Sequence, residues 1–391
     1  MSVHKCPLRI ELGFVGLAIV LGIGGNVVPL STTAAADGSL HEEDDGTIHV
    51  PAFSFPESSY LSEETRAALK QLRGLDAFQT TLKACPPLEG AARAEVAAIR
   101  RCQAESFYKT GFYKDVRNRY PVVLTTQRIG GVYTEIFTPK EGIAKRNEHL
   151  VLINLHGGGF SYYARINSHL ESIPIASVGK FKVISIDYRQ APEYTFPAAS
   201  EDVAEVYREL LRTYAPHNVG LYGCSAGGVL AAESIVWFQK HKLPLPGAVG
   251  MFCSGADKAL DANTRKSHRS DSGYFAAAVA GGYKPLNYFR GVDQRDPLVN
   301  PGDSDELMAE FPPSLLISGT RDMALSSTVV THAQLVRLGV EAELHVWEGM
   351  EHAFHYFPQL PESREAYDVI VTFFEAHLGG QSPRAHRMSR T

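Results

Sequence analysis

Short apolar runs recur along the chain from about residue 130 onward, and longer amphipathic stretches separate them. The runs predicted as strands are 132–137, 150–155, 183–186, 219–222, 250–253, 315–318 and 343–347. Polar or glycine residues bound these runs, as expected for strands buried in a sheet. Helical patterns lie between them, notably over residues 227–239 and 327–338. The alternation predicts an α/β fold whose mostly parallel sheet is covered by helices on both faces.

Helical patterns also precede the first predicted strand, outside the strand–helix alternation. Residues 62–114 carry apolar positions at helical spacing, and residues 91–104 are rich in Ala, Glu and Arg. We therefore expect these helices to form a cap rather than part of the sheet. Residues 256–295 break the rhythm again with many Gly, Ser, Tyr and charged positions, which predicts a second cap insertion.

The N-terminal sequence predicts an export signal. Lys5 and Arg9 precede an apolar stretch over residues 12–25, and residues 34–36 form a small-residue cleavage site. The apolar stretch is shorter than the roughly 20 residues of a membrane-spanning helix. We expect residues 1–36 to be the cleaved signal peptide of a secreted or periplasmic protein, with no membrane span in the mature chain. The alternatives are an uncleaved membrane anchor and a wrongly chosen start codon.

The rest of the chain divides into a core and additions to it. The predicted segments are 37–120 (leader and N-terminal cap helices), 121–255 (first part of the α/β core), 256–295 (cap insertion), 296–378 (second part of the core) and 379–391 (disordered tail). The leader is acidic and the tail is polar and basic, and such compositions are typical of segments that do not pack into a core.

Composition and charge exclude some functions. The chain has 391 residues, of which 44% are hydrophobic and 21% are charged, as in an ordinary globular protein. The net charge is −5, and the sequence contains no stripe of basic residues. We therefore expect no nucleic-acid partner. The sequence has no zinc-type spacing of Cys and His and no phosphate-binding glycine loop, so we expect no metal and no cofactor. The oligomeric state stays open.

Cleavage of the predicted signal peptide would leave four cysteines. Cys85 and Cys102 flank a helix-like stretch, so a local disulfide between them is compatible with an exported chain. Cys224 and Cys253 lie beside core strands, where buried free thiols are common.

Two glycine-rich motifs follow predicted strands and carry the candidate chemistry. They are His156-Gly157-Gly158-Gly159 and Gly223-Cys224-Ser225-Ala226-Gly227. The second matches G-x-S-x-G, in which a serine on a tight strand-to-helix turn has its hydroxyl exposed above the sheet. The first offers backbone N–H groups to a developing oxyanion. Together they predict an α/β-hydrolase that performs acyl transfer through Ser225.

A serine nucleophile needs a base within hydrogen-bond reach and a third group that orients the base. In α/β-hydrolases an acid and then a histidine follow the serine along the chain. Asp322 follows the predicted strand 315–318, and His352 follows the predicted strand 343–347, so we expect them to complete a triad with Ser225. The rivals for these two positions are Asp296, Asp303 and His355.

The backbone around these side chains completes the predicted site. The expected oxyanion-hole donors are the N–H groups of Gly157, Gly158, Gly159 and Ala226. Glycine suits this loop because a side chain would block the approach of the substrate oxygen to the backbone. The aromatic candidates for the substrate pocket are Phe160, Tyr162, Tyr163, Tyr188, Tyr274 and Phe275. His156 is expected to shape the glycine turn and not to act as a base.

The motifs resemble those of the hormone-sensitive-lipase-like carboxylesterases, the bacterial family IV esterases. The segments that carry the resemblance are 156–160, 187–193, 196–199, 223–228, 319–322 and 349–354, within a match over about 122–377. The resemblance implies an eight-stranded core, a helical cap and hydrolysis of short- to medium-chain acyl esters, and it supports Ser225, Asp322 and His352 as the triad. Cys224 departs from the family, which usually has Asp there.

The resemblance also implies structural roles for Arg189, Glu193 and Asp202 in an ion-pair network near the oxyanion loop. It leaves other reactions open, because one triad can serve an amidase, a lactonase or a deacetylase. A non-catalytic ligand-binding protein on the same fold is a further alternative, which the presence of His352 disfavours. The expected partner is a small-molecule ester.

Overall fold

The computed structural model describes residues 41–46, 48–49, 56–74, 83–88, 90–257 and 288–379. The predicted signal peptide, most of the predicted cap insertion, Tyr274 and Phe275, and the tail from residue 380 lie outside these residues. Among the described residues, no helix combines the length and the hydropathy needed to cross a bilayer.

The chain forms two units, residues 1–56 and 57–391. In the described part of the first unit, β1 (His41–Glu42) pairs antiparallel with β2 (Ile48–His49). All elements named below belong to the second unit.

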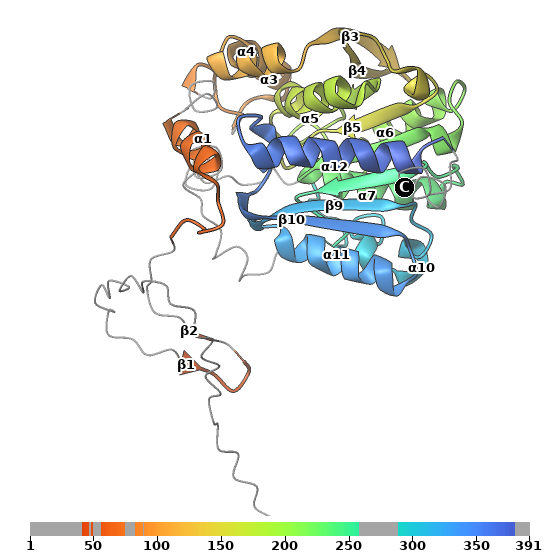
Figure 1. Ribbon diagram of the computed structural model, residues 1–391. Coiled ribbons are helices and arrows are strands. Elements are labelled where there is room, and N and C mark those ends of the chain that lie inside the picture. Colours follow the sequence, from red (N-terminus) through yellow and green to blue (C-terminus); the bar gives the residue numbers. More distant parts are fainter. Residues whose placement is uncertain are drawn as a thin grey trace, which may run out of the picture. The chain divides into compact units, whose positions relative to one another are not determined.

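An eight-stranded sheet forms the centre of the second unit, in the order β10-β9-β8-β7-β5-β6-β4-β3 (Figure 1). Its strands are β3 (Val122–Ile129), β4 (Val132–Pro139), β5 (Val151–Leu155), β6 (Val183–Ile186), β7 (Val219–Cys224), β8 (Ala248–Phe252), β9 (Ser314–Arg321) and β10 (Ala342–Glu351). Pairing is antiparallel between β3, β4 and β6 and parallel across the rest of the sheet. The predicted eight-stranded, mostly parallel α/β-hydrolase sheet is confirmed.

Helices cover both faces of the sheet, as the alternation predicts. The helices of the second unit, within the described residues, are α1 (Glu63–Gly74), α3 (Arg93–Tyr108), α4 (Gly111–Arg119), α5 (Ala164–Gly179), α6 (Ala198–Leu210), α7 (Ala226–Lys240), α10 (Asp305–Met308), α11 (Leu325–Arg337) and α12 (Pro361–His377). Short 3-10 helices are η1 (Lys145–Asn147), η2 (Pro216–Asn218), η3 (Pro301–Asp303) and η4 (Phe354–Tyr356). In Figure 1, α5 and α12 lie in front of the sheet, with α6 and α7 behind it.

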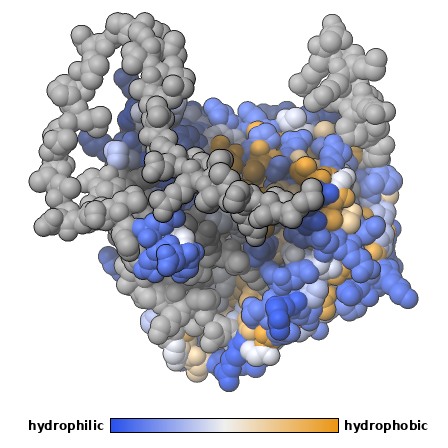
Figure 2. Space-filling view, turned by 90° about the horizontal axis from the view of Figure 1, so that it is seen from below, coloured by the Kyte–Doolittle hydropathy of each residue, from blue (hydrophilic) through white to orange (hydrophobic). Residues whose placement is uncertain are grey.

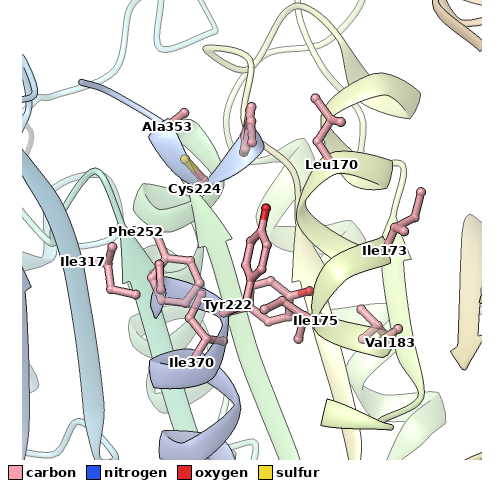
Figure 3. Close-up of a cluster of buried hydrophobic side chains, with 14 of the residues drawn as sticks. Leu170, Ile173, Ile175, Val183, Tyr222, Cys224, Phe252, Ile317, Ala353 and Ile370 are labelled. Carbon is pink, nitrogen blue, oxygen red and sulfur yellow. The ribbon is translucent and has the colours of Figure 1, made fainter. Parts of the chain in front are cut away.

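The two faces of the sheet bury separate hydrophobic clusters, because successive side chains of a strand point in opposite directions. On β7, Tyr222 joins the cluster under α5 and α12, whereas Leu221 joins the cluster under α6 and α7. Figure 3 shows the first cluster, where Leu170 and Ile370 converge on the strands. This double burial explains why the parallel strands appear in the sequence as continuous apolar runs.

The first strand of the sheet differs from the sequence prediction. The predicted series begins at residue 132, but β3 precedes it over Val122–Ile129. Its central residues are polar and largely exposed because β3 is an edge strand, so it lacks the apolar run that marks the central strands.

The opposite edge of the sheet has some exposed apolar side chains. They are Val329, Val330 and Val336 of α11 and Val346 of β10. Figure 2 views the molecule from below, the side on which α11 and β10 lie in Figure 1, and apolar residues there lie among polar ones. Scattered exposed valines of this kind are ordinary on a protein surface.

Cys85 and Cys102 form a disulfide, with Cα atoms 5.9 Å apart, which confirms the local link expected from the sequence. It connects the segment before α3 to α3 itself. Cys224 and Cys253 are free and buried, also as expected.

Replacing both Cys85 and Cys102 by serine is expected to lower the free energy of unfolding by about 3 kcal/mol. The bond closes the loop between residues 85 and 102 in the unfolded chain and so reduces its conformational entropy. Thermal unfolding of the double variant and the wild type, each with and without a reductant, measures the effect. The reductant should destabilise the wild type alone. Equal melting temperatures for both proteins without reductant would contradict a stabilising role.

Candidate active site

Ser225 lies in a tight turn between β7 and α7. Its backbone has φ 57° and ψ −123°, which is a strained conformation for a residue with a side chain. A Cβ atom at Gly223 would lie 2.2 Å from the Leu155 carbonyl oxygen, and one at Gly227 would lie 1.8 Å from the same oxygen. The turn therefore requires glycine on both sides of Ser225, which explains the G-x-S-x-G pattern.

A hydrogen-bonded chain of three side chains begins at this serine. His352 Nε2 lies 2.9 Å from Ser225 Oγ, and His352 Nδ1 lies 2.6 Å from Asp322 Oδ1. A neutral imidazole satisfies both contacts when Nδ1–H donates to Asp322 and Nε2 accepts from the serine hydroxyl. The side chains that the sequence predicts as a triad thus lie in mutual contact, at the carboxyl ends of β7, β9 and β10.

Asp322 is 1% exposed and His352 is 2% exposed, so the pair is shielded from water. Burial alone would raise the pKa of Asp322, but the adjacent His352 and hydrogen bonds from Ala324 N and Ser318 Oγ lower it below its ordinary value. The aspartate therefore carries a negative charge at neutral pH, next to the imidazole that it can stabilise.

Close backbone packing holds the histidine loop in place. A Cβ atom at Gly319 of β9 would lie 2.0 Å from the Met350 carbonyl oxygen, so the ends of β9 and β10 approach closely only with glycine. Beyond β10, Ala353 N donates to Cys253 Sγ over 3.2 Å. This contact anchors the loop immediately after His352.

The rival residues lie elsewhere. His355 is buried, and its two ring nitrogens have no hydrogen-bond partner among the described residues. Burial lowers the pKa of His355 to about 3, which makes it a far weaker base than an ordinary histidine. Asp296 caps its own turn by accepting from Leu298 N, and Asp303 accepts from the side chain of Asn300.

The glycine loop after β5 adopts conformations that favour glycine. Gly158 has φ 117° and Gly159 has φ 58°. Gly157 N donates to Glu171 Oε1 over 2.8 Å, so this N–H is directed into the core and away from a substrate oxygen. The expectation that Gly157 is an oxyanion-hole donor is therefore wrong in this structure. Gly158, Gly159 and Ala226 remain as the candidate donors.

Glu171 of α5 is the residue of this region that the sequence analysis missed. Besides Gly157 N, its carboxylate accepts hydrogen bonds from Asn154 Nδ2 at 2.7 Å, Cys224 N at 3.3 Å and the Tyr356 hydroxyl. One signal in the sequence could have identified it, namely an acidic residue inside the apolar run of a buried helix.

The aromatic residues predicted for the pocket pack around the glycine loop. Tyr188 is buried, its ring stacks on His156 at 4.3 Å, and its hydroxyl donates to the His156 carbonyl. Phe160 stacks on Tyr288 at 4.8 Å, and Tyr162 is also buried. These contacts support the loop, and their role in substrate binding stays a prediction. Burial lowers the pKa of His156, which keeps its imidazole neutral.

The ion pairs near the loop differ from the single network that the resemblance implied. Arg189 pairs with Asp202 at 2.8 Å, as expected. Glu193 instead pairs with Arg100 of α3 at 2.9 Å, and Arg100 also donates to the Ser161 and Ala191 carbonyls. Helix α3 is thereby attached to the segment that follows the glycine loop.

Two buried groups of side chains in the described part of the chain have the spacing of metal ligands. They are Cys224, Cys253 and His355, and Cys253, Asp322 and His352. The second group uses two members of the hydrogen-bonded chain. In both groups a metal would have to displace thiol protons, and burial raises the pKa of Cys224 and of Cys253. We assign no metal to either group.

Known proteins share this fold. A family model described as the alpha/beta hydrolase fold matches residues 152–356. An acetyl-hydrolase of Streptomyces hygroscopicus is 29% identical over 237 residues, which are 60% of this chain and 78% of that protein.

Two solved structures extend the likeness to most of the chain. The crystal structure of an esterase is 28% identical with a TM-score of 0.68, and the match covers 84% of this chain and 98% of that one. An esterase from the bacterial hormone-sensitive lipase family is 25% identical with a TM-score of 0.60, over 82% of this chain and 99% of that one.

Proposed function

The chain belongs to the family with the α/β-hydrolase fold and is a carboxylic ester hydrolase, and we propose that it hydrolyses short- to medium-chain acyl esters through Ser225, His352 and Asp322. The observation that carries this proposal is the continuous hydrogen-bonded chain from Asp322 through His352 to the serine hydroxyl. The strained turn at Ser225 supports it, because such a turn exposes a nucleophile above the sheet.

The proposed reaction has two halves. Ser225 Oγ attacks the ester carbonyl as His352 Nε2 takes the hydroxyl proton, and Asp322 stabilises the imidazolium that forms. The oxyanion accepts hydrogen bonds from the N–H groups of Gly158, Gly159 and Ala226, each contributing about 3–4 kcal/mol to transition-state stabilisation. The imidazolium then protonates the departing alkoxide. A water molecule, deprotonated by the same histidine, hydrolyses the acyl-enzyme and restores the serine.

Acetyl groups fall within the proposed substrate class. One relative is named an acetyl-hydrolase, and another, from Dothistroma septosporum, is named a versiconal hemiacetal acetate esterase. These names favour the short end of the acyl range. Amidase, lactonase and deacetylase activities remain alternatives, because the same triad would serve each of them.

We also propose that the chain is exported. The signal-like sequence over residues 1–36 is the basis for this proposal, and the disulfide between Cys85 and Cys102 supports it, because such bonds persist in oxidising compartments. N-terminal sequencing of protein secreted by its host would test it, and a mature chain beginning at Asp37 is the expected result.

The rate of hydrolysis of p-nitrophenyl esters from acetate to palmitate is expected to peak at short acyl chains. We expect a fall on the order of tenfold or more toward palmitate, since each misfit methylene costs about 1–3 kcal/mol of transition-state binding. Values of kcat/KM across the series measure the acyl preference. A maximum at palmitate would contradict the short-chain assignment, and no turnover of any ester by folded protein would contradict the esterase.

The amidase alternative needs a matched pair of substrates. p-Nitroacetanilide and p-nitrophenyl acetate share an acetyl group and a p-nitrophenyl ring, and they differ in whether a nitrogen or an oxygen joins the two. The esterase proposal expects turnover of the ester alone. Turnover of the anilide with the ester left intact would favour the amidase.

A further inference from the structure

Glu171 is an acidic residue in an apolar environment. It lies in α5 with 3% of its surface exposed, between Leu170 and Ile173 of the hydrophobic cluster shown in Figure 3. Burying a carboxylate is costly unless hydrogen bonds replace its water. Each of its four donors is therefore important for the free energy of the folded state.

The four donors come from four separate places in the chain. Asn154 lies on β5, and Gly157 lies in the glycine loop that follows this strand. Cys224 ends β7, immediately before Ser225, and Tyr356 lies in η4, four residues after His352. The carboxylate thus contacts the glycine loop, the serine turn and the segment beyond the histidine at once.

We propose that Glu171 is a positioning residue of the active site, whose carboxylate fixes the glycine loop, the serine turn and the segment after His352 relative to one another. This proposal rests on the proposed function, because it assigns Glu171 to the reaction of that same site. Glu171 does not touch the substrate. Its effect passes through the backbone of its partners to the groups that do.

The glycine loop shows how this effect would reach the reaction. Gly157 N is held by Glu171 Oε1, which fixes the peptide plane from which the chain continues into Gly158 and Gly159. These two residues carry candidate oxyanion donors. A donor displaced by about 1 Å from its productive position can cost on the order of a hundredfold in rate.

The orientation of the carboxylate is itself fixed. Asn154 donates to Glu171 Oε2 through its amide nitrogen, while its amide oxygen accepts from the Ser185 hydroxyl over 2.6 Å. Asn154 therefore cannot turn its oxygen toward Glu171 without losing both contacts. The carboxylate is aligned from the β5 side by a side chain that has a partner of its own.

The protonation state of Glu171 decides how many donors it can accept. Burial raises the pKa of Glu171 to about 7. The hydrogen bonds from Tyr356, Gly157, Asn154 and Cys224 act in the opposite direction and offset part of this rise. The other titratable groups that face it are Tyr222, Tyr356 and the Cys224 thiol. Burial raises the pKa of Tyr222 and of Cys224, so both stay neutral near pH 7.

The ionised carboxylate accepts from all four donors, whereas protonation replaces one acceptor position with an O–H group. We therefore expect kcat to rise with pH as Glu171 ionises around pH 7. The free energy of unfolding should change with pH in the opposite direction to kcat. The pKa is raised in the folded state, so the free energy of unfolding should fall as pH rises from the ordinary pKa of a glutamate to about 7.

The test compares E171Q with E135Q and the wild type. Glu135 of β4 is a matched control, because it is also a buried carboxylate that contacts α5, where it accepts from Ser168 Oγ at 2.7 Å. For hydrolysis of p-nitrophenyl acetate between pH 5.5 and 9, we expect E171Q to lower kcat by about tenfold to a hundredfold with little change in KM. E135Q should keep kcat within about twofold of the wild type.

The pH profile separates positioning from a merely structural role. All three proteins keep Ser225, His352 and Asp322, so a component near pH 7 that disappears in E171Q alone belongs to Glu171. Values of kcat for E171Q within twofold of the wild type, or an equal loss in E135Q, would overturn the proposal. An unchanged pH profile in E171Q would do so as well.

A second variant keeps the test valid if E171Q does not fold. Y356F removes one donor and leaves the carboxylate in place. Because the hydrogen bond from Tyr356 lowers the pKa of Glu171, the component near pH 7 should move to higher pH in Y356F. An unmoved profile would contradict the proposal.

A fluorophosphonate probe distinguishes failure of this proposal from failure of the proposed function. The wild type should be labelled at Ser225 and E171Q should be labelled more slowly. A folded wild type that neither reacts with the probe nor hydrolyses any ester would refute the serine hydrolase itself. Equal labelling of the wild type and E171Q would refute only the role of Glu171.

Discussion

Replacing Ser225 by alanine is expected to lower kcat for p-nitrophenyl acetate by about 10⁶-fold, the loss typical of removing a serine nucleophile. Alanine removes only the oxygen that attacks the carbonyl. The turn at φ 57° and the flanking glycines are unchanged, so the protein should fold as the wild type does. Burst and steady-state rates at saturating ester, together with circular dichroism and thermal unfolding, measure both expectations.

Ser234 provides the matched control. It lies in α7, the helix that begins after Ser225, and it is fully buried with its hydroxyl donating to the Leu230 carbonyl over 2.6 Å. Ser234→Ala likewise removes one serine hydroxyl, here from the helix that follows Ser225, and kcat should stay within about twofold of the wild type. If Ser225→Ala kept more than a hundredth of the wild-type kcat, Ser225 could not be the nucleophile.

Much of the fold could be predicted because burial on both faces leaves a clear mark in the sequence. Strand β6 matches its apolar run at residues 183–186, and the other parallel strands match their runs to within a few residues. Strand β3 could not be recognised in this way. It is an exposed edge strand, so nothing requires its central residues to be apolar.

The three side chains of the hydrogen-bonded chain could be predicted because each follows a strand of the same sheet. Parallel strands bring their carboxyl ends to one edge, so position along the chain is enough to place Ser225, Asp322 and His352 together. Asp296 and Asp303 do not directly follow a predicted strand, whereas His355 lies three residues after His352 and could be set aside only with coordinates.

The role of Glu171 could not be read from the sequence. Its partners Gly157, Cys224 and Tyr356 lie 14, 53 and 185 residues away along the chain. No short sequence motif indicates contacts between residues so far apart along the chain. The incorrect assignment of Gly157 to the oxyanion hole has the same cause. The motif predicts that this N–H lies near the site, but its direction depends on the distant Glu171.

Replacing Asp322 by asparagine is expected to lower kcat by about 10⁴-fold, although the two side chains have nearly the same shape. Asp322 accepts hydrogen bonds from Ser318 Oγ, Ala324 N and His352 Nδ1. An asparagine side chain has only one oxygen that can accept hydrogen bonds from these three donors. If its NH₂ faces the imidazole, His352 takes the wrong tautomer and Nε2 can no longer accept the serine proton. If its oxygen faces the imidazole, the negative charge that stabilises the imidazolium is still lost.

Steady-state kcat values for Ser225→Ala, Asp322→Asn and the double variant test whether the residues act as one unit. When a base and its orienting carboxylate serve a single nucleophile, their losses do not add, so the double variant should be about as slow as Ser225→Ala alone. Additive losses would mean that Asp322 acts on a step that does not involve Ser225. A kcat for Asp322→Asn within tenfold of the wild type would remove Asp322 from the triad, and the histidine would then need another partner.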